Sequence, residues 1–386
     1  MTKYAAFRSA ALFAAMSVLF AAGCKSGPDT TSETAPTEQK KGEPQIADVD
    51  SELYWYQRGA DATKAIWAKF RLSDDVALVA DGNGGIAPSY RFSTYAFDLL
   101  LDNVSTFWRK DLATEAVDAY FGDFSRVYPD RAANFRNGDV LRWAAACTRA
   151  SLVTGKGMYL EEARKLYDAL WLQQVDNTLG GGMWHRNDAR NAKSASANLC
   201  AVIVALNLYH ATQDVKYLLQ GRKLYKWTAE HLFDKSTGAV CEGSLADGSY
   251  STVSSTGAIG LFVGASMRLY RATGSAVYLA NAKKAADRMV GAAGPGGIVR
   301  CAEYTEESIS NGIALRHLAE LARRPGCERY REFILANARA AWTSRRLSDG
   351  LNGPDWAKVP LATDSVKPQT ALSAAILYFA ASRACR

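Results

Sequence analysis

Apolar residues recur at helical spacing along the chain from residue 49 onward, and this pattern repeats. The segments 154–170, 212–228 and 273–289 each begin with a short polar turn and continue as an amphipathic helix, and residues 324–342 are a fainter copy. A tyrosine near the start of each copy recurs at intervals of 58, 61 and 52 residues. A period of this length accommodates two helices and their connections, which indicates a helical repeat architecture.

The segments that precede these copies have a different character. Residues 198–212 (NLCAVIVALNLYHAT) and 255–273 are apolar or small nearly all round, as is typical of helices buried on every side. Buried helices are expected at 92–108, 138–153, 194–211, 255–272, 307–322 and 367–384. Amphipathic helices are expected at 51–71, 111–127, 157–173, 214–233, 275–290 and 326–344. Six buried helices alternating with six amphipathic ones predict a single all-α domain, an (α/α)6 toroid with the buried helices inside.

The connections between the expected helices are of two kinds. Those that lead from a buried to an amphipathic helix are short, such as TGKG, TQD and TGS, whereas the return connections are long and contain glycines and aromatic residues. The two kinds lie at opposite ends of the ring, so the long loops gather at one end, which we call the mouth. Long loops on a rigid scaffold often carry binding residues, and we expect the functional site at the mouth.

The first 48 residues differ from the rest of the chain. Residues 1–23 combine Lys3 and Arg8 with an apolar stretch too short to span a bilayer, which predicts a secretory signal peptide. Small residues precede Cys24 as in the lipobox of a bacterial lipoprotein, so we expect lipidation at Cys24. Residues 24–48 are polar and predict a tether, and residues 49–386 form the domain. We expect a protein of the bacterial envelope, at the outer membrane, whose only membrane contact is the lipid anchor.

Charge and cysteine content narrow the possible functions. The formal charge is +7, but Lys and Arg form no basic stripe in the domain, which argues against a nucleic-acid partner. The four histidines and the cysteines show no metal-ligand spacing, and we expect a monomer without metal or cofactor. Cys147 and Cys200 are predicted to be packed thiols. Two disulfides are conceivable, Cys327 with Cys385 and Cys241 with Cys301.

Asp139 is the candidate for chemistry, because it stands at the start of the second buried helix and therefore at the mouth. A carboxylate in the first turn of a helix also has a structural interpretation, since it interacts favourably with the positive end of the helix dipole and accepts hydrogen bonds from the free backbone N–H groups. Position alone does not separate the two.

Aromatic residues in the long loops are candidates for sugar binding. GGGMWHR (180–186) presents Trp184 and His185 on a glycine-rich turn, and Tyr250 and Trp356 lie in comparable loops. Each aromatic ring either stacks on a pyranose or packs back onto the rim of the domain. The glycines of GPGGIV (294–299) follow a helix and precede no Walker lysine, so a phosphate loop is not expected there.

Several of these segments together resemble one enzyme family. The YRATG-type turns, GGGMWHR followed by NAKSASANLCAVIVALNLY, and STGAIGLFVGASMRLYRATGSAVYL resemble glycoside hydrolase family 76, the bacterial and fungal endo-α-1,6-mannanases. The resemblance covers nearly all of residues 51–384 and is strongest over 135–290. It implies a carbohydrate-active protein for α-mannan-type glycans.

The resemblance also shows where this chain departs from the family. The family carries a tandem Asp-Asp before a tryptophan-rich helix, as nucleophile and general acid/base of a retaining mechanism. Matching Trp143 to the family tryptophans places the pair at Gly138 and Asp139, so the nucleophile position is a glycine. Arg142 replaces a family tryptophan, which suggests altered sugar subsites.

Two functions follow from this departure. Either a second acid from the mouth acts with Asp139, which would be the general acid of a hydrolase, or the site binds glycans without cleaving them. The hydrolase is slightly favoured because one acid remains in place. Loop candidates for the second acid are Asp188, Glu242, Asp247, Glu303, Glu306, Asp355 and Asp364. Toroidal cyclases and prenyltransferases are disfavoured, because neither zinc ligands nor an acidic diphosphate motif is visible.

Overall fold

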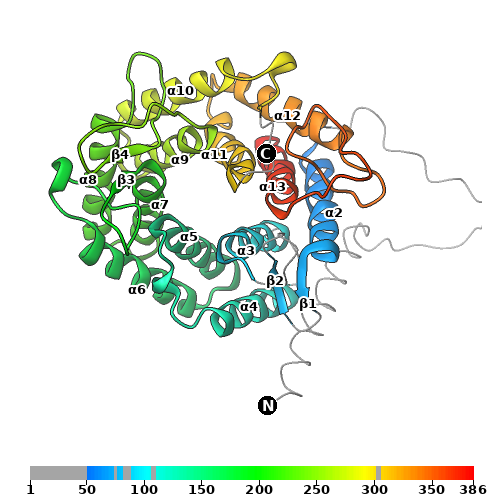
Figure 1. Cartoon of the computed structure of the whole chain (residues 1–386), viewed down its shortest axis with the longest axis horizontal. Helices are drawn as coiled ribbons and strands as arrows, with labels where there is room; N and C mark the ends of the chain where they lie inside the picture. The colour runs from blue at the N-terminus through cyan, green and yellow to red at the C-terminus, as the bar shows by residue number, and fades with distance from the viewer. Residues whose placement is uncertain (1–49, 74–75, 81–87, 106–109, 301–305) are drawn as a thin grey trace, which may run out of the picture.

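The computed structural model describes residues 50–73, 76–80, 88–105, 110–300 and 306–386. Within them, six inner helices stand side by side around a central axis and six outer helices surround them (Figure 1). The signal peptide, Cys24 and the tether lie outside the described residues. The predicted (α/α)6 toroid is confirmed.

The inner and outer helices alternate along the chain as the hydrophobic pattern predicts. The inner helices are α3 (Tyr90–Val104), α5 (Asn137–Thr154), α7 (Ala195–Thr212), α9 (Thr256–Thr273), α11 (Ser310–Ala322) and α13 (Pro368–Ala384). The outer helices are α2 (Glu52–Phe70), α4 (Lys110–Val127), α6 (Gly157–Gln174), α8 (Val215–His231), α10 (Ala276–Gly291) and α12 (Glu328–Thr343).

Burial follows composition in these helices. In α7 nearly every residue from Ala195 to Leu208 is buried, whereas α8 buries only one stripe, which includes Tyr217, Leu224 and Trp227. Among the described residues, α7 alone has the length and apolar composition that a membrane crossing requires, and 67% of that stretch is buried inside the domain. Its apolar surface therefore belongs to the core.

Glycines allow the inner helices to approach one another closely. A Cβ atom on Gly260 of α9 would lie 2.3 Å from the Cα of Ala314 in α11. A Cβ on Gly312 of α11 would lie 2.1 Å from the carbonyl oxygen of Ser373 in α13. Neither position accommodates a larger side chain without separating the helices.

The described part of the chain contains four short strands that the sequence pattern did not predict. β1 (Arg71–Ser73) pairs with β2 (Val76–Val79), and β3 (Ala192–Ser194) pairs antiparallel with β4 (Gly243–Leu245), with Lys193 opposite Ser244. The β3–β4 pair joins the loop after α6 to the loop after α8 and lies at the mouth. Strands of three or four residues are too short to show a period of two in the sequence.

The ring closes where the two ends of the domain meet. The Ser382 hydroxyl, near the end of α13, donates a hydrogen bond of 2.9 Å to the carbonyl oxygen of Glu52 at the start of α2. The Cys385 thiol donates to the carbonyl oxygen of Asp50 at 2.8 Å. First and last helices are thus held together as neighbours in the ring.

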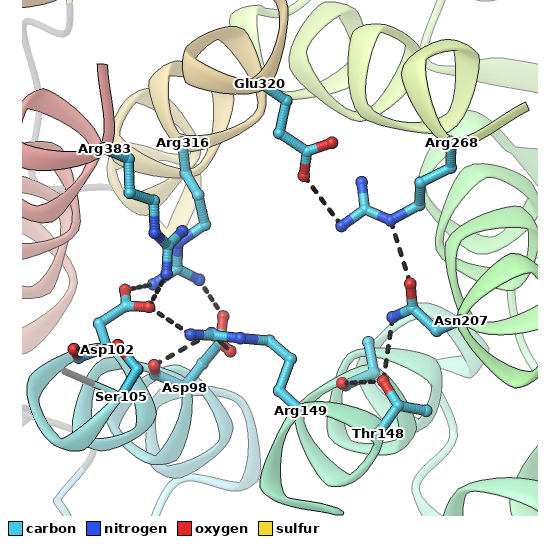
Figure 2. A network of polar contacts seen from close by, with 11 residues as sticks. Asp98, Asp102, Ser105, Thr148, Arg149, Asn207, Arg268, Arg316, Glu320 and Arg383 are labelled. Atoms are coloured by element: carbon cyan, nitrogen blue, oxygen red, sulfur yellow. Dashed lines mark hydrogen bonds and ion pairs between the residues drawn. The ribbon is translucent and has the colours of Figure 1, made fainter. Parts of the chain in front are cut away.

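Ion pairs connect the inner helices at the end of the axis opposite the mouth. Figure 2 shows the carboxylates of Asp98 and Asp102 from α3 facing Arg149 from α5, Arg316 from α11 and Arg383 from α13. We call these five residues the axial network.

A second set of contacts continues around the axis from this network. Arg268 of α9 pairs with Glu320 of α11 at 3.1 Å and donates to the Asn207 side-chain oxygen of α7 at 3.2 Å. All six inner helices therefore contribute polar side chains around the axis at this end.

The cysteines are free thiols among the described residues. Cys147 and Cys200 are buried in inner helices, which confirms the prediction of packed thiols. Cys327 and Cys385 are both free, so the disulfide considered between them is not formed. Cys301, the partner considered for Cys241, lies outside the described residues.

Candidate functional site

A pocket of about 400 Å³ opens at the mouth, where the inner helices begin. Its lining includes the second residue of four inner helices: Arg91 of α3, Gly138 of α5, Ser196 of α7 and Gly257 of α9. Residues of β3 and β4 and of the loops next to these strands complete it on one side. The pocket thus lies at the end of the ring that the long connections predict.

Asp139 lies in this pocket and is bound by two arginines. Its side chain is almost completely buried, with the residue 4% exposed. The Nε of Arg91 donates to both carboxylate oxygens at 3.1 Å, and an Nη of Arg142 donates to one of them at 2.7 Å. The residue before α5 is Arg136, and no side chain caps this helix. Asp139 is therefore a pocket residue held in a charged network, in addition to being an acid in a first helical turn.

The position before Asp139 is filled from α7 rather than by a carboxylate. A Cβ atom on Gly138 would lie 2.8 Å from the Ser196 hydroxyl oxygen. That hydroxyl accepts a hydrogen bond of 2.8 Å from the guanidinium of Arg142, which also lies 5.6 Å from the ring centroid of Tyr95. Burial raises the pKa of Tyr95 to about 12, so its phenol stays neutral. Arg142 and Ser196 together occupy the surroundings of Gly138.

Glu242 is the second acid at this pocket within the described residues. It precedes β4, and its backbone is fixed on both sides, because its N–H donates to the Val253 carbonyl at 2.9 Å and its carbonyl accepts from the Ala195 N–H at 2.8 Å.

The other candidates for the second acid are placed elsewhere or are not described. Asp188 pairs with Arg186, Asp247 accepts from Ser249, and Asp355 and Asp364 accept from backbone N–H groups of their own loop. None of these four lines the pocket. Glu303 and the side chain of Glu306 lie outside the described residues.

His185 lies in the pocket, next to the start of α7. Its Nδ1 is 2.9 Å from the Ser194 hydroxyl, and its backbone N–H donates to the Ala192 carbonyl at 2.8 Å. Burial, with the nearby positive charge of Arg136, lowers its pKa below the usual 6.5. A neutral imidazole therefore faces the pocket at neutral pH.

Trp184 does not form a sugar-stacking surface. The residue is 3% exposed, its indole N–H donates to Asp176 at 2.7 Å, and the Lys193 ammonium lies 4.6 Å from its ring centroid. Of the two interpretations of the glycine-rich loop, the packed one describes the structure. The sugar-binding assignment of Trp184 is corrected accordingly.

Trp356 and Tyr250 also lie apart from the pocket lining. Trp356 is 2% exposed and packs in the core, which corrects its assignment as a binding residue. Tyr250 is 49% exposed on the hairpin that follows β4, close in sequence to Ser251, which does line the pocket. Of the predicted site residues, the structure brings together Asp139, Arg142 and His185.

Sequence reasoning missed Arg91, Tyr95, Arg136 and Ser196. Arg91 and Ser196 stand at the second position of α3 and α7, which is the position of Gly138 in α5. Counting positions from the start of each inner helix was therefore the signal that could have identified Arg91 and Ser196. Among the residues that the structure describes, no group of three or more His, Cys, Asp and Glu side chains is placed to hold a metal ion.

Comparisons with known proteins place the chain in one family. The family model described as glycosyl hydrolase family 76 matches residues 36–378. An inactive variant of an α-1,6-mannanase from Salegentibacter sp. HEL1_6, with two consecutive aspartates replaced by asparagine and α-1,6-mannotriose bound, is 25% identical. It covers 85% of this chain and 99% of its own, with a TM-score of 0.77.

Other solved structures share the fold at lower identity. A Listeria innocua protein is 23% identical over 85% of this chain and 96% of its own, with a TM-score of 0.78. A family 76 mannosidase from Bacteroides thetaiotaomicron is 17% identical over 86% and 98%, with a TM-score of 0.74. A search of curated protein sequences gives no match. The chain belongs to glycoside hydrolase family 76.

Proposed function

We propose that this chain is a lipid-anchored protein of the bacterial envelope that binds α-1,6-mannan-type glycans in the mouth pocket. The pocket size suits sugar residues, and the Salegentibacter relative holds α-1,6-mannotriose. The lipidation predicted at Cys24 would keep the domain where it meets polymers too large to cross the envelope.

The observation that favours binding over cleavage is the pair of residues at 138 and 139. A retaining glycosidase needs two carboxyl groups about 5–5.5 Å apart. Gly138 supplies none, and both oxygens of Asp139 accept hydrogen bonds from Arg91 and Arg142. In this arrangement the Asp139 carboxylate is engaged by two arginines, and residue 138 places no second carboxyl group beside it.

Hydrolysis by a different pair of acids is the second candidate function. It is favoured by one observation, that Glu242 lines the same pocket as Asp139. Asp139 would protonate the leaving glycosidic oxygen, and Glu242 would activate the attacking water.

One assay on α-1,6-mannan separates the two functions. The full-length chain is incubated with the polysaccharide and new reducing ends are counted, while calorimetry measures binding of α-1,6-mannotriose. We expect binding without new reducing ends. Reducing ends that appear with the wild type and vanish in both Asp139→Ala and Glu242→Gln would establish the hydrolase instead. Asp188→Ala is the matched control, since Asp188 is an exposed mouth acid outside the pocket.

A further inference from the structure

Arg142 places a positive charge at the floor of a pocket that a neutral mannose would not require. One Nη of its guanidinium donates to Asp139 and the other donates to Ser196. A guanidinium has five N–H donors, so these two bonds leave donors for a ligand. Its side chain is 19% exposed although it lies between inner helices. That exposed part faces the pocket, which Arg142 lines.

The helices that begin at the pocket add to this positive potential. Gly138, Ser196 and Gly257 are the second residues of α5, α7 and α9, and all three line it. The first turn of a helix carries backbone N–H groups without intrahelical acceptors, together with the positive end of the helix dipole. The first turn of α5 contains Asp139, whose carboxylate is bound by Arg91 and Arg142, whereas the first turns of α7, α9 and α11 contain no acidic residue. Converging helix starts of this kind favour bound anions.

The two departures from the family pattern change the charge in the same direction. By the resemblance given in the sequence analysis, Gly138 stands where the family has an aspartate and Arg142 where it has a tryptophan, so the first removes a negative charge and the second adds a positive one. Asp139 and Glu242 both line the pocket, and Asp139 fixes the orientation of Arg142 through the 2.7 Å contact. A guanidinium whose orientation is fixed by a neighbouring carboxylate is well suited to recognise the oxygens of a phosphate, sulfate or carboxylate group.

We propose that the floor of the pocket binds an oxyanion, with Arg142 and Ser196 as its side-chain donors. The anion is a phosphate, sulfate or carboxylate substituent on the bound glycan, or a free phosphate ion beside it. This inference rests on the proposed function, because it names the class of glycan that the same pocket takes. Arg142 is the residue that determines this specificity.

Calorimetry on the full-length chain in detergent micelles tests the proposal with matched probes. Methyl α-D-mannopyranoside is the neutral probe, mannose 6-phosphate and D-mannuronate carry an anionic group, and inorganic phosphate is the free ion. A hydrogen bond to a charged group contributes about 1.5–3 kcal/mol, so the anionic sugars should bind about tenfold or more tightly than the neutral one. Raising the salt concentration should weaken the anionic probes and leave the neutral probe unchanged.

Three variants of the pocket floor and one control test whether the preference for anionic probes comes from Arg142. Arg142→Gln should abolish the preference for anionic probes, and Arg142→Lys should retain part of it. Gly138→Asp should abolish it too, because it supplies an internal carboxylate beside Arg142. Arg164→Gln is the control, since Arg164 is an exposed arginine of α6 that pairs with Glu161 far from the pocket. If a pocket variant fails to fold, the wild-type preference and its salt dependence still decide.

Each outcome has a defined meaning. Tight binding of mannose 6-phosphate with weak binding of inorganic phosphate supports the anion as a substituent of the glycan. Equally tight binding of inorganic phosphate supports a free ion as the source. Equal affinity for neutral and anionic sugars overturns the inference and leaves the proposed function standing. No binding of any of these probes overturns the inference, and only a failure to bind α-1,6-mannotriose as well overturns the proposed function.

Discussion

Replacing Asp102 by asparagine should destabilise the domain strongly. The Asp102 side chain is 1% exposed and receives hydrogen bonds from Arg149, Arg316 and Arg383, which come from three different inner helices (Figure 2). Asp98 also pairs with Arg149 and Arg316, but Arg383 has no second acid among the ion pairs of the described residues. Removing one partner of a buried ion pair costs about 3–5 kcal/mol, because the opposite charge stays buried.

Equilibrium unfolding in urea measures this loss. The free energy of unfolding of Asp102→Asn should fall by about 3–5 kcal/mol relative to the wild type, with an unchanged dependence on urea. Asp188→Asn is the control, because Asp188 forms an exposed pair with Arg186 that contributes at most about 1 kcal/mol. A loss in Asp102→Asn no larger than that of the control would refute the assignment of the axial network as a major stabilising element.

The same carboxylate should make stability depend on pH in acid. Burial alone would raise the pKa of Asp102, but the guanidinium groups of Arg149, Arg316 and Arg383 outweigh it and hold the pKa well below its usual 3.8. A pKa that is lower in the folded state gives stability that is complete above the unfolded pKa and is lost as the pH falls below it. The difference in stability between wild type and Asp102→Asn should therefore shrink below about pH 4. A constant difference down to pH 2 would contradict this reasoning.

Three further predictions concern buried groups of the domain. Gly312→Ala should lower the free energy of unfolding by about 1–3 kcal/mol, whereas Gly122→Ala, which meets no neighbour within 4 Å, should be neutral or stabilising in the same urea titration. Lys193→Met should lower the melting temperature, because the buried Lys193 ammonium donates to three loop carbonyls, at 2.7, 2.6 and 3.2 Å, that would lose this donor; an unchanged melting temperature would refute this. Cys147 and Cys200 should resist a thiol reagent until urea is added, since burial raises the pKa of both thiols; rapid labelling of either in the native protein would contradict their burial.

The helices were predictable because their pattern is long and periodic. The helix expected at 214–233 spans Val215–His231, and the one expected at 138–153 spans Asn137–Thr154. Such segments contain several turns, so a few ambiguous residues do not change the period. The location of the pocket followed from the connections, because long loops at one end of a ring require no knowledge of side-chain contacts.

The identity of the pocket residues was less predictable, because it depends on contacts between distant segments. Arg91 binds Asp139 across 48 residues of sequence, and no local pattern links the two. Trp184 is buried because its indole N–H donates a hydrogen bond to Asp176 and the Lys193 ammonium lies over its ring. Both partners come from other parts of the connection between α6 and α7. A tryptophan in a glycine-rich loop has the same local sequence whether it faces a ligand or the core.

Binding of α-1,6-mannotriose to a protein with a blocked pocket tests the central claim most directly. Ser251 lines the pocket from the hairpin after β4, and Ser251→Trp would fill the space next to it. Val253, two residues further on, is exposed and absent from the lining, so Val253→Trp is the matched control. We predict that calorimetry detects mannotriose binding to the wild type and to Val253→Trp, and none to Ser251→Trp. Undiminished binding to Ser251→Trp, or no binding to the wild type, would contradict the account.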